Sequence, residues 1–297
     1  MRLAVTGKNG QVVSALRALA NEDLEIIPLG RPELDLGFPE TVAEAIQSAK
    51  PDVVISAAAY TAVDKAENEP DTAFALNRDG AAAVAKAAAV LDIPIIHIST
   101  DYVFDGGGKI ACMENDPTEP ASVYGRSKLA GEHAVKEYTP NHVILRIAWV
   151  YSVYGNNFVK TMLRLAENRD EINVVNDQFG CPTAADDVAT AIVTIARRLA
   201  ADNSPELRGI FHMSGAGETS WAGFARYIFE TSAKNGGKPV VVHDITTADY
   251  PTPARRPANS RLDSSKLERI YGIRLPDWKK STNAVIAALA ESKERTS

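Results

Sequence analysis

The sequence predicts an α/β fold, a doubly wound parallel sheet with a smaller C-terminal lobe. Short apolar runs at residues 3–6, 52–57, 93–98 and 142–147 have the length and composition of buried parallel strands. Amphipathic helical segments separate these runs, as expected for repeated β-α-β units. A glycine turn joins the first run to a helix, which is how dinucleotide-binding sheets begin.

Composition narrows the class of protein. The 297 residues are 45% hydrophobic and 24% charged, with a net charge of −6. An acidic chain of this kind is a poor general binder of nucleic acid or of membrane surfaces. The two cysteines, Cys112 and Cys181, form no CxxC pair, which indicates a reducing compartment without disulfides or zinc. No signal-peptide pattern opens the sequence, and residues 81–91 are too short to span a bilayer, so we expect a cytoplasmic protein.

The glycine turn predicts a phosphate site. Gly7 allows the tight turn, and Gly10 lets the backbone approach a pyrophosphate at the helix N-terminus. Val13 stands where a third glycine is usual, which weakens the contact between helix and strand and leaves the phosphate site intact. A strand, a glycine turn and a helix in this order are typical of the start of a Rossmann-like domain. The alternative is a glycine turn that binds no ligand.

The second strand, residues 24–29, bears on the choice of cofactor. An Asp or Glu at the end of this strand commonly meets a free ribose 2′-hydroxyl. Here Gly30 and Arg31 follow the strand, and Arg31 is suited to a 2′-phosphate, which favours NADPH. Asp35 lies in a loop within reach of the adenine. The alternative for Arg31 is a solvated loop cation.

Small residues follow the third strand. Ala57, Ala58 and Ala59 allow a flat ligand to approach closely, which places the ribose and pyrophosphate of a dinucleotide there. The acidic residues of the following loop, Asp64, Glu67 and Glu69, are read as solvated, and no metal site is predicted.

The fourth strand leads to a hydroxyl. Thr100 follows residues 93–98, where its side chain can reach a substrate carbonyl or, alternatively, cap a turn. Tyr102 and Phe104 are predicted to line a sugar pocket. A long helix at residues 71–91 precedes this strand, and Asn77 within it predicts a buried hydrogen bond to a nearby loop.

Tyr124 and Lys128 lie one helical turn apart on a helix that Ser122 is expected to cap. An ammonium group close to a phenol lowers the phenol pKa, and such a tyrosine exchanges protons with a carbonyl or alcohol. Taken alone, a Tyr-x-x-x-Lys pair is more often an ordinary pair of neighbours on an exposed helix surface.

In this order, a strand with a terminal Thr and a helix carrying Tyr-x-x-x-Lys resemble the extended short-chain dehydrogenase/reductase superfamily. The resemblance implies that Thr100, Tyr124 and Lys128 are catalytic. The order of segments along the chain predicts a dinucleotide-binding domain over residues 1–150, with residues 151–297 forming mainly a substrate-binding lobe interleaved with it.

Further motifs are similar to those of the dTDP-4-dehydrorhamnose reductase family over essentially the whole chain. They include Asp177, Gln178, Gly180, Pro182 and Thr183, and later Arg256, Pro257, Asn259 and Ser260. The resemblance implies reduction at C4 of dTDP-4-dehydro-6-deoxy-L-mannose to dTDP-L-rhamnose by NADPH, with NADH as an alternative. It implies cofactor contacts from Gly7, Asn9, Gly10, Gln11, Val12, Arg31, Asp35, Leu36, Ala57, Ala58, Ala59, Tyr60, Tyr124 and Lys128. It implies substrate contacts from Thr61, Val63, Thr100, Asp101, Tyr102, Trp149 and Asn157.

Three points stay open in the sequence. Some family members bind Mg2+ at a dimer interface through Glu residues, and no such Glu accompanies Ser14 and Ala15 here, so we predict no metal and either a monomer or a homodimer. A nucleotide-sugar epimerase with tightly bound NAD is the first alternative function. A non-catalytic subunit of the kind that regulates methionine adenosyltransferase is the second.

Overall fold

The computed structural model describes residues 1–294. Six parallel strands form the central sheet in the order β10-β5-β4-β3-β1-β2. Their bounds are β1 Arg2–Thr6, β2 Glu25–Leu29, β3 Val53–Ser56, β4 Ile95–Thr100, β5 His142–Ile147 and β10 Gly209–Met213. From β1 the chain crosses first to β2 and then to β3 on the opposite side, so the winding reverses between β1 and β3. Ligands of such sheets bind at this reversal, beyond the carboxyl ends of the strands.

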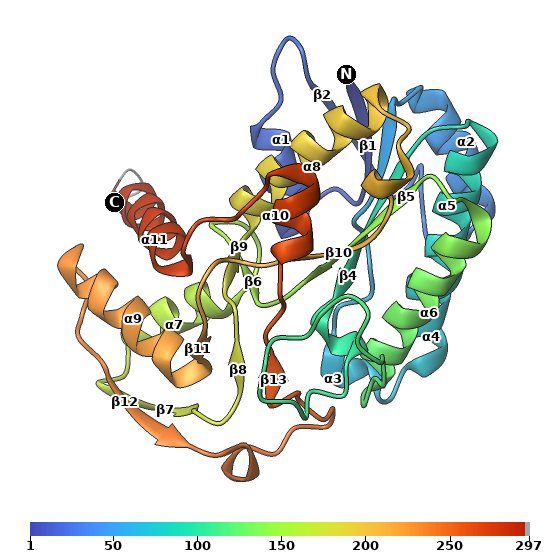
Figure 1. The fold of residues 1–297 in the computed structure, drawn as a ribbon. Coiled ribbons are helices and arrows are strands. Elements are labelled where there is room, and N and C mark those ends of the chain that lie inside the picture. Colours follow the sequence, from blue (N-terminus) through green and yellow to red (C-terminus); the bar gives the residue numbers. More distant parts are fainter. Residues whose placement is uncertain (295–297) are drawn as a thin grey trace.

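Helices cover both faces of the sheet (Figure 1). On one face lie α1 Gln11–Ala18, α8 Ala185–Ala201 and α10 Ser265–Tyr271, and Leu16 and Ile192 pack there against Val5. On the other face lie α2 Glu40–Ala49, α5 Gly80–Val90 and α6 Val123–Tyr138, where Ile46 and Val84 pack against Val54. The doubly wound Rossmann-like fold expected from the sequence is therefore confirmed.

A smaller lobe has its own core. It is built from α7 Phe158–Ala166, α9 Trp221–Lys234 and α11 Trp278–Glu294, beside the paired strands β7 Glu171–Val175 and β12 Val241–Ile245. Phe224 and Ile228 lie at its centre. Two small sheets complete the lobe. In one, β6 Val150–Tyr151 pairs with β9 Thr183–Ala184. In the other, β8 Phe179–Gly180 pairs with both β11 Thr219–Ser220 and β13 Asn259–Ser260. Between these segments the chain returns to the main sheet through α8, β10 and α10.

The segment expected as one long helix has a different shape. It consists of α4 Pro70–Phe74, the π-helical turn η1 Ala75–Asp79 and then α5. The buried side chain of Asn77 lies within the π turn, where it bonds to a neighbouring loop and to α6 rather than to solvent. Short π turns of this kind are frequently found at functional sites.

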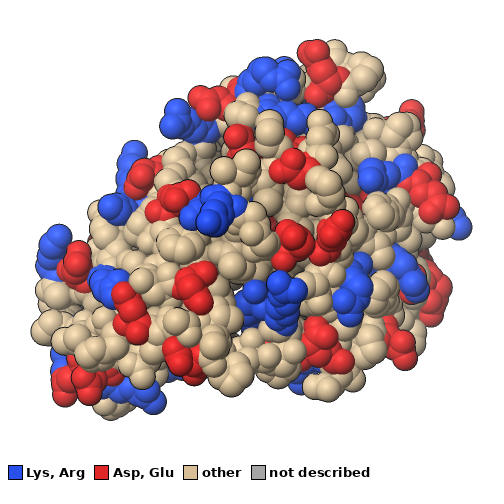
Figure 2. Space-filling view, turned by 60° about the horizontal axis from the view of Figure 1, so that its bottom comes forward, with Lys and Arg blue, Asp and Glu red and all other residues tan. Residues whose placement is uncertain are grey.

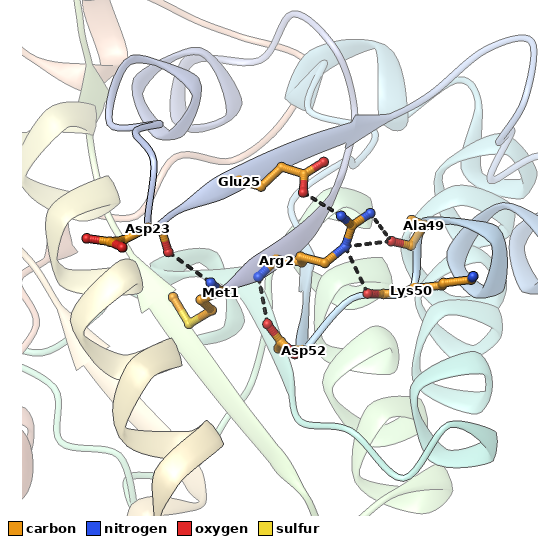
Figure 3. A network of polar contacts seen from close by, with 7 residues as sticks. All are labelled: Met1, Arg2, Asp23, Glu25, Ala49, Lys50 and Asp52. Atoms are coloured by element: carbon orange, nitrogen blue, oxygen red, sulfur yellow. Dashed lines mark hydrogen bonds and ion pairs between the residues drawn. The ribbon is translucent and has the colours of Figure 1, made fainter.

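The amino-terminal edge of the sheet is held by Arg2 (Figure 3). Its guanidinium donates to the carboxylate of Glu25 at 2.5 Å and to the carbonyl oxygens of Ala49 and Lys50, and its backbone N–H donates to Asp52 at 2.7 Å. These partially exposed contacts join β1, β2 and the loop before β3. The cavity described below lies at the opposite edge of the sheet, beyond the carboxyl ends of the strands.

Charges of both signs are interspersed on the face presented in Figure 2. Within residues 1–294, no helix is long and apolar enough to cross a membrane.

Candidate active site

Two adjoining cavities lie at the carboxyl edge of the sheet. The larger, of about 550 Å³, is bounded by the loops after β1, β3, β4 and β5 and by the first turns of α6. The smaller, of about 330 Å³, lies between the turn after β1 and the loop after β2. Asn9 and Ala59 line both, so the cavities form one continuous site that crosses the point where the winding reverses.

The residues of the glycine turn fit a dinucleotide phosphate. Gly7 has a φ of +99°, which L side chains rarely adopt, and Gly10 precedes α1 without an acidic residue in the first helical turn. Thr6 Oγ1 accepts the backbone N–H groups of Ala57 and Ala58 at 3.0 and 2.9 Å, which fixes the alanine loop opposite the turn. A helix N-terminus with free N–H groups in this setting attracts a pyrophosphate.

Cationic groups gather at the smaller cavity. The Arg31 side chain is 74% exposed and lies 2.7 Å from the Asp35 carboxylate. Lys8 Nζ donates to the Arg31 carbonyl oxygen at 2.8 Å and to Glu33 at 2.6 Å. Exposed pairs of this kind contribute little stability, so both cations are available to a phosphate.

Helix α6 presents Tyr124 to the larger cavity. Ser122 caps the helix by accepting the Gly125 N–H at 3.1 Å, as predicted. A Cβ on Gly125 would lie 2.2 Å from the Tyr102 carbonyl oxygen, so a glycine is required for the helix to approach the loop after β4. The rings of Tyr102 and Tyr124 then meet edge to face at 5.5 Å.

The phenol of Tyr124 is held in its protonated form. Burial raises its pKa, and the neighbouring groups Asp101 and Tyr102 raise it further, while a hydrogen bond from Thr100 lowers it. The expectation that Lys128 lowers this pKa is wrong, because burial of the phenol is the main influence on the pKa and raises it. The phenol therefore carries its proton at neutral pH, and a strongly basic oxygen beside it would be needed to take that proton.

Lys128 is buried and anchored to β4. Its ammonium donates to the Ile98 carbonyl oxygen at 2.7 Å. Burial lowers its pKa to about 8, and the carboxylate of Glu132 opposes that decrease. The side chain is therefore largely charged at neutral pH and loses its charge in mildly alkaline solution.

Thr100 caps a turn, one of the two roles weighed for it in the sequence, and it also lines the larger cavity. Its hydroxyl oxygen accepts the Tyr102 N–H at 3.2 Å, which caps the turn, and its hydroxyl donates to Asp101 Oδ1 at 3.1 Å. Asp101 is buried beside the cavity, and burial raises its pKa to about 6.

Asn77 joins the alanine loop to α6. Its amide accepts the Tyr60 N–H at 2.8 Å, donates to the Tyr60 carbonyl oxygen at 3.1 Å and donates to Ser127 Oγ at 2.9 Å. Ser127 in turn donates to the Tyr124 carbonyl oxygen at 2.8 Å. The buried hydrogen bond predicted for Asn77 is therefore confirmed, and it reaches the helix that carries Tyr124.

Trp149 closes the larger cavity from the lobe. Its φ is +49°, which is rare for a bulky residue. The indole stacks on Trp221 with ring centroids 3.5 Å apart, and a Cβ on Gly180 would lie 2.5 Å from it. Trp221 on one side and Gly180 on the other thus hold the Trp149 indole in place beside the cavity.

Most predicted site residues line the two cavities, and three lie elsewhere. Asn157 caps α7, and its amide nitrogen donates to Gln11, Ser152 and Tyr154, so it supports the wall rather than facing the cavity. The Tyr60 hydroxyl donates to Glu69 at 2.6 Å, away from the cofactor cavity. Phe104 is buried against His212 and Arg146 rather than in a sugar pocket.

The acidic loop after the alanine run is structural rather than merely solvated. Asp64 pairs with Arg256 at 2.5 Å, Glu67 accepts the N–H of Val123 at the start of α6, and Glu69 accepts from Tyr60. In the described part of the chain, no three His, Cys, Asp or Glu side chains gather as metal ligands would.

Several lining residues carry no sequence signal of their own. They belong to loops whose neighbours were predicted, and their positions depend on how those loops pack: Lys8, Val13, Gly30, Leu34, Leu76, Ile98, Ser99, Ile147, Val150, Gly155 and Asn156. These residues line the two cavities because the order of the strands brings their loops together, and no local sequence pattern predicts that order.

Comparisons with known proteins agree with this geometry. Residues 1–291 match the family model described as RmlD substrate binding domain. The chain is 61% identical to a dTDP-4-dehydrorhamnose reductase of Sinorhizobium fredii, over 97% of this chain and 98% of that protein. It is 44% identical to the enzyme of that name from Escherichia coli K12, over 94% of each. A crystal structure of dTDP-4-dehydrorhamnose reductase from Bacillus anthracis in complex with NADP is similar at a TM-score of 0.90 and 36% identity, covering 97% of this chain and 99% of that one.

Proposed function

The chain belongs to the RmlD substrate-binding-domain family, and from this premise we propose that it reduces the C4 carbonyl of dTDP-4-dehydro-6-deoxy-L-mannose to give dTDP-L-rhamnose. The observation that carries the proposal is the meeting of Thr100, Tyr124 and Lys128 at one cavity that continues into a dinucleotide site. The reaction fits an NADP-type cofactor, which the similar Bacillus anthracis enzyme binds.

The cofactor is held by the turn after β1 and the alanine loop after β3. Gly7 and Gly10 receive the pyrophosphate at the N-terminus of α1, and Ala57 and Ala59 leave room for the sugar rings. Arg31 and Lys8 bind the 2′-phosphate, which makes NADPH the preferred donor over NADH. When bound, the reduced nicotinamide supplies the hydride.

Tyr124 acts as the general acid. The phenol is protonated at neutral pH, so it has a proton to donate to the oxygen that becomes negatively charged as the carbonyl is reduced. The donation is favourable because the alkoxide formed there is a stronger base than the phenolate left behind. Thr100 redirects its hydroxyl proton from Asp101 to the same oxygen and stabilises the developing charge. Thr100 and Tyr124 both line the larger cavity, so their hydroxyl groups can approach one substrate oxygen.

Lys128 binds the nicotinamide ribose. Its ammonium group has three N–H donors. One stays bonded to the Ile98 carbonyl oxygen, and the other two are available to donate to the ribose hydroxyls. Thr61, Val63, Tyr102 and Trp149 surround the sugar of the substrate. Asp101, beside Thr100, contributes a polar contact to the same sugar.

The test is an assay of the purified protein with dTDP-4-dehydrorhamnose and either NADPH or NADH. We expect the absorbance of NADPH to fall in proportion to the sugar consumed. An epimerase would interconvert sugars without net cofactor consumption, and a non-catalytic subunit would leave both substrates unchanged. Either outcome would refute the proposed reduction.

A further inference from the structure

A buried ion pair lies directly beneath the proposed catalytic residues. Glu132 on α6 is fully buried and Arg146 on β5 is 2% exposed. Arg146 donates to both carboxylate oxygens, from Nε at 2.9 Å and from Nη2 at 2.7 Å. Burying such charges is costly, and a buried ion pair is often no more stabilising than apolar residues of similar volume. Stability alone therefore does not account for this pair.

A third partner connects the pair to the site. Ser99 Oγ donates to Glu132 Oε1 at 2.5 Å. The residues on either side of Ser99 both serve the catalytic helix, because the Ile98 carbonyl oxygen accepts from Lys128 and the Thr100 hydroxyl bonds to Tyr124. Glu132 thus holds the end of β4 at the point where that strand meets both catalytic side chains.

Glu132 is also the charge that faces Lys128. Tyr124, Lys128 and Glu132 follow one another at intervals of four residues along one side of α6. His97 faces Lys128 from β4 and stays uncharged, because burial lowers its pKa well below the usual value. The Tyr124 phenol is neutral as well, and from β5 the charge of Arg146 is engaged by Glu132 itself.

We propose that Glu132 is a positioning residue for the reductase site. Through Ser99 it sets the position of β4 relative to α6, and through its charge it keeps Lys128 protonated under working conditions. Arg146 holds the carboxylate in place through hydrogen bonds to both of its oxygens. This proposal depends on one part of the proposed function, namely that Lys128 binds the cofactor.

The test is the affinity for NADPH as a function of pH, measured by fluorescence titration without the sugar substrate. In the wild type, we expect affinity to fall as the pH rises through about 8, where Lys128 loses its proton. In Glu132→Gln this fall should move to lower pH by about one unit, because the attraction that favours the ammonium is gone. Failure of the sugar assay would not affect this measurement, so the two proposals can fail independently.

Two further variants separate the effects. Ser99→Ala removes the link to β4 while leaving the carboxylate, so we expect lower kcat and an unchanged pH dependence of NADPH affinity. Glu137→Gln changes an exposed carboxylate on the same helix and should reproduce the wild type.

Loss of one partner of a buried pair threatens folding, so the decisive variant is the double substitution Glu132→Met with Arg146→Met. Apolar replacement of both charges preserves volume and is commonly tolerated. The folded double variant should also show the fall in NADPH affinity at lower pH than the wild type. A fall at the wild-type pH, in this variant or in Glu132→Gln, would overturn the proposal.

Discussion

The ammonium group of Lys128 lies 2.7 Å from the carbonyl oxygen of Ile98, to which it donates a hydrogen bond. This contact joins α6 to β4 just before Thr100, and so fixes the distance between the strand end and the catalytic helix. It also means that the lysine is oriented by the sheet before any ligand is considered. A pre-oriented donor contributes to catalysis because no side-chain ordering is needed at the moment of reaction.

Replacement of Tyr124 by Phe should abolish most turnover while leaving cofactor binding intact. Removal of a general acid typically lowers kcat by about 10²–10⁴-fold, and the phenyl ring preserves the packing against Tyr102. The measurements are NADPH oxidation with the ketosugar and NADPH titration without it. Tyr138→Phe, on an exposed position of the same helix, is the control and should behave as wild type. Full turnover in Tyr124→Phe would remove this residue from the mechanism.

The pH dependence of kcat/KM for NADPH should show an alkaline limb set by Lys128. Burial lowers the pKa of Lys128 to about 8, so the charged form predominates below that pH and activity declines as the pH rises through it. Lys128→Arg carries a group that does not titrate in this range, so any activity it retains should lack the limb. A limb at the same pH in that variant would assign the titration to another group.

Asn77→Ala should weaken both the fold and catalysis. The substitution leaves the Tyr60 backbone groups and Ser127 without their partner, and the loss of buried hydrogen bonds costs about 1–3 kcal/mol. Urea denaturation measures the free energy of unfolding, and kcat should fall because the start of α6 is no longer tied to the alanine loop. Asn168→Ala, at an exposed helix end, is the matched control. Equal stability of the two variants would contradict this role for Asn77.

Arg31→Ala should reduce the preference for NADPH. A charged hydrogen bond to phosphate contributes about 1.5 kcal/mol or more, so we expect roughly tenfold weaker binding of NADPH and little change for NADH. Arg17→Ala, which removes an exposed arginine from the last turn of α1, should leave both affinities unchanged. Parallel losses for both cofactors would show that Arg31 does not recognise the 2′-phosphate.

The central elements of the fold could be predicted because their signals are local. Each parallel strand is a short apolar run, Gly7 marks the first turn, and Ser122 marks the start of α6. The carboxyl ends of parallel strands share one edge, so Thr100 and Tyr124 could be placed near each other before the structure was known.

The parts that sequence could not predict depend on contacts between distant segments. Strand β7 pairs with β12 and not with the main sheet, and that pairing joins segments 70 residues apart. The π turn at Asn77 and the burial of Phe104 likewise depend on partners elsewhere in the chain. The Tyr-x-x-x-Lys spacing predicts a neighbouring cation but not the burial of the phenol, so it gives the wrong direction for the Tyr124 pKa shift.

The central claim is that one cavity brings a reducible sugar carbon and the reduced nicotinamide together beside Tyr124. The most direct measurement uses NADPH labelled with deuterium at the transferable position of nicotinamide C4, with product analysis by mass spectrometry and NMR. We predict that the deuterium is found on C4 of dTDP-rhamnose, bonded to carbon. A product that lacks the label, or carries it at another carbon, would contradict the account.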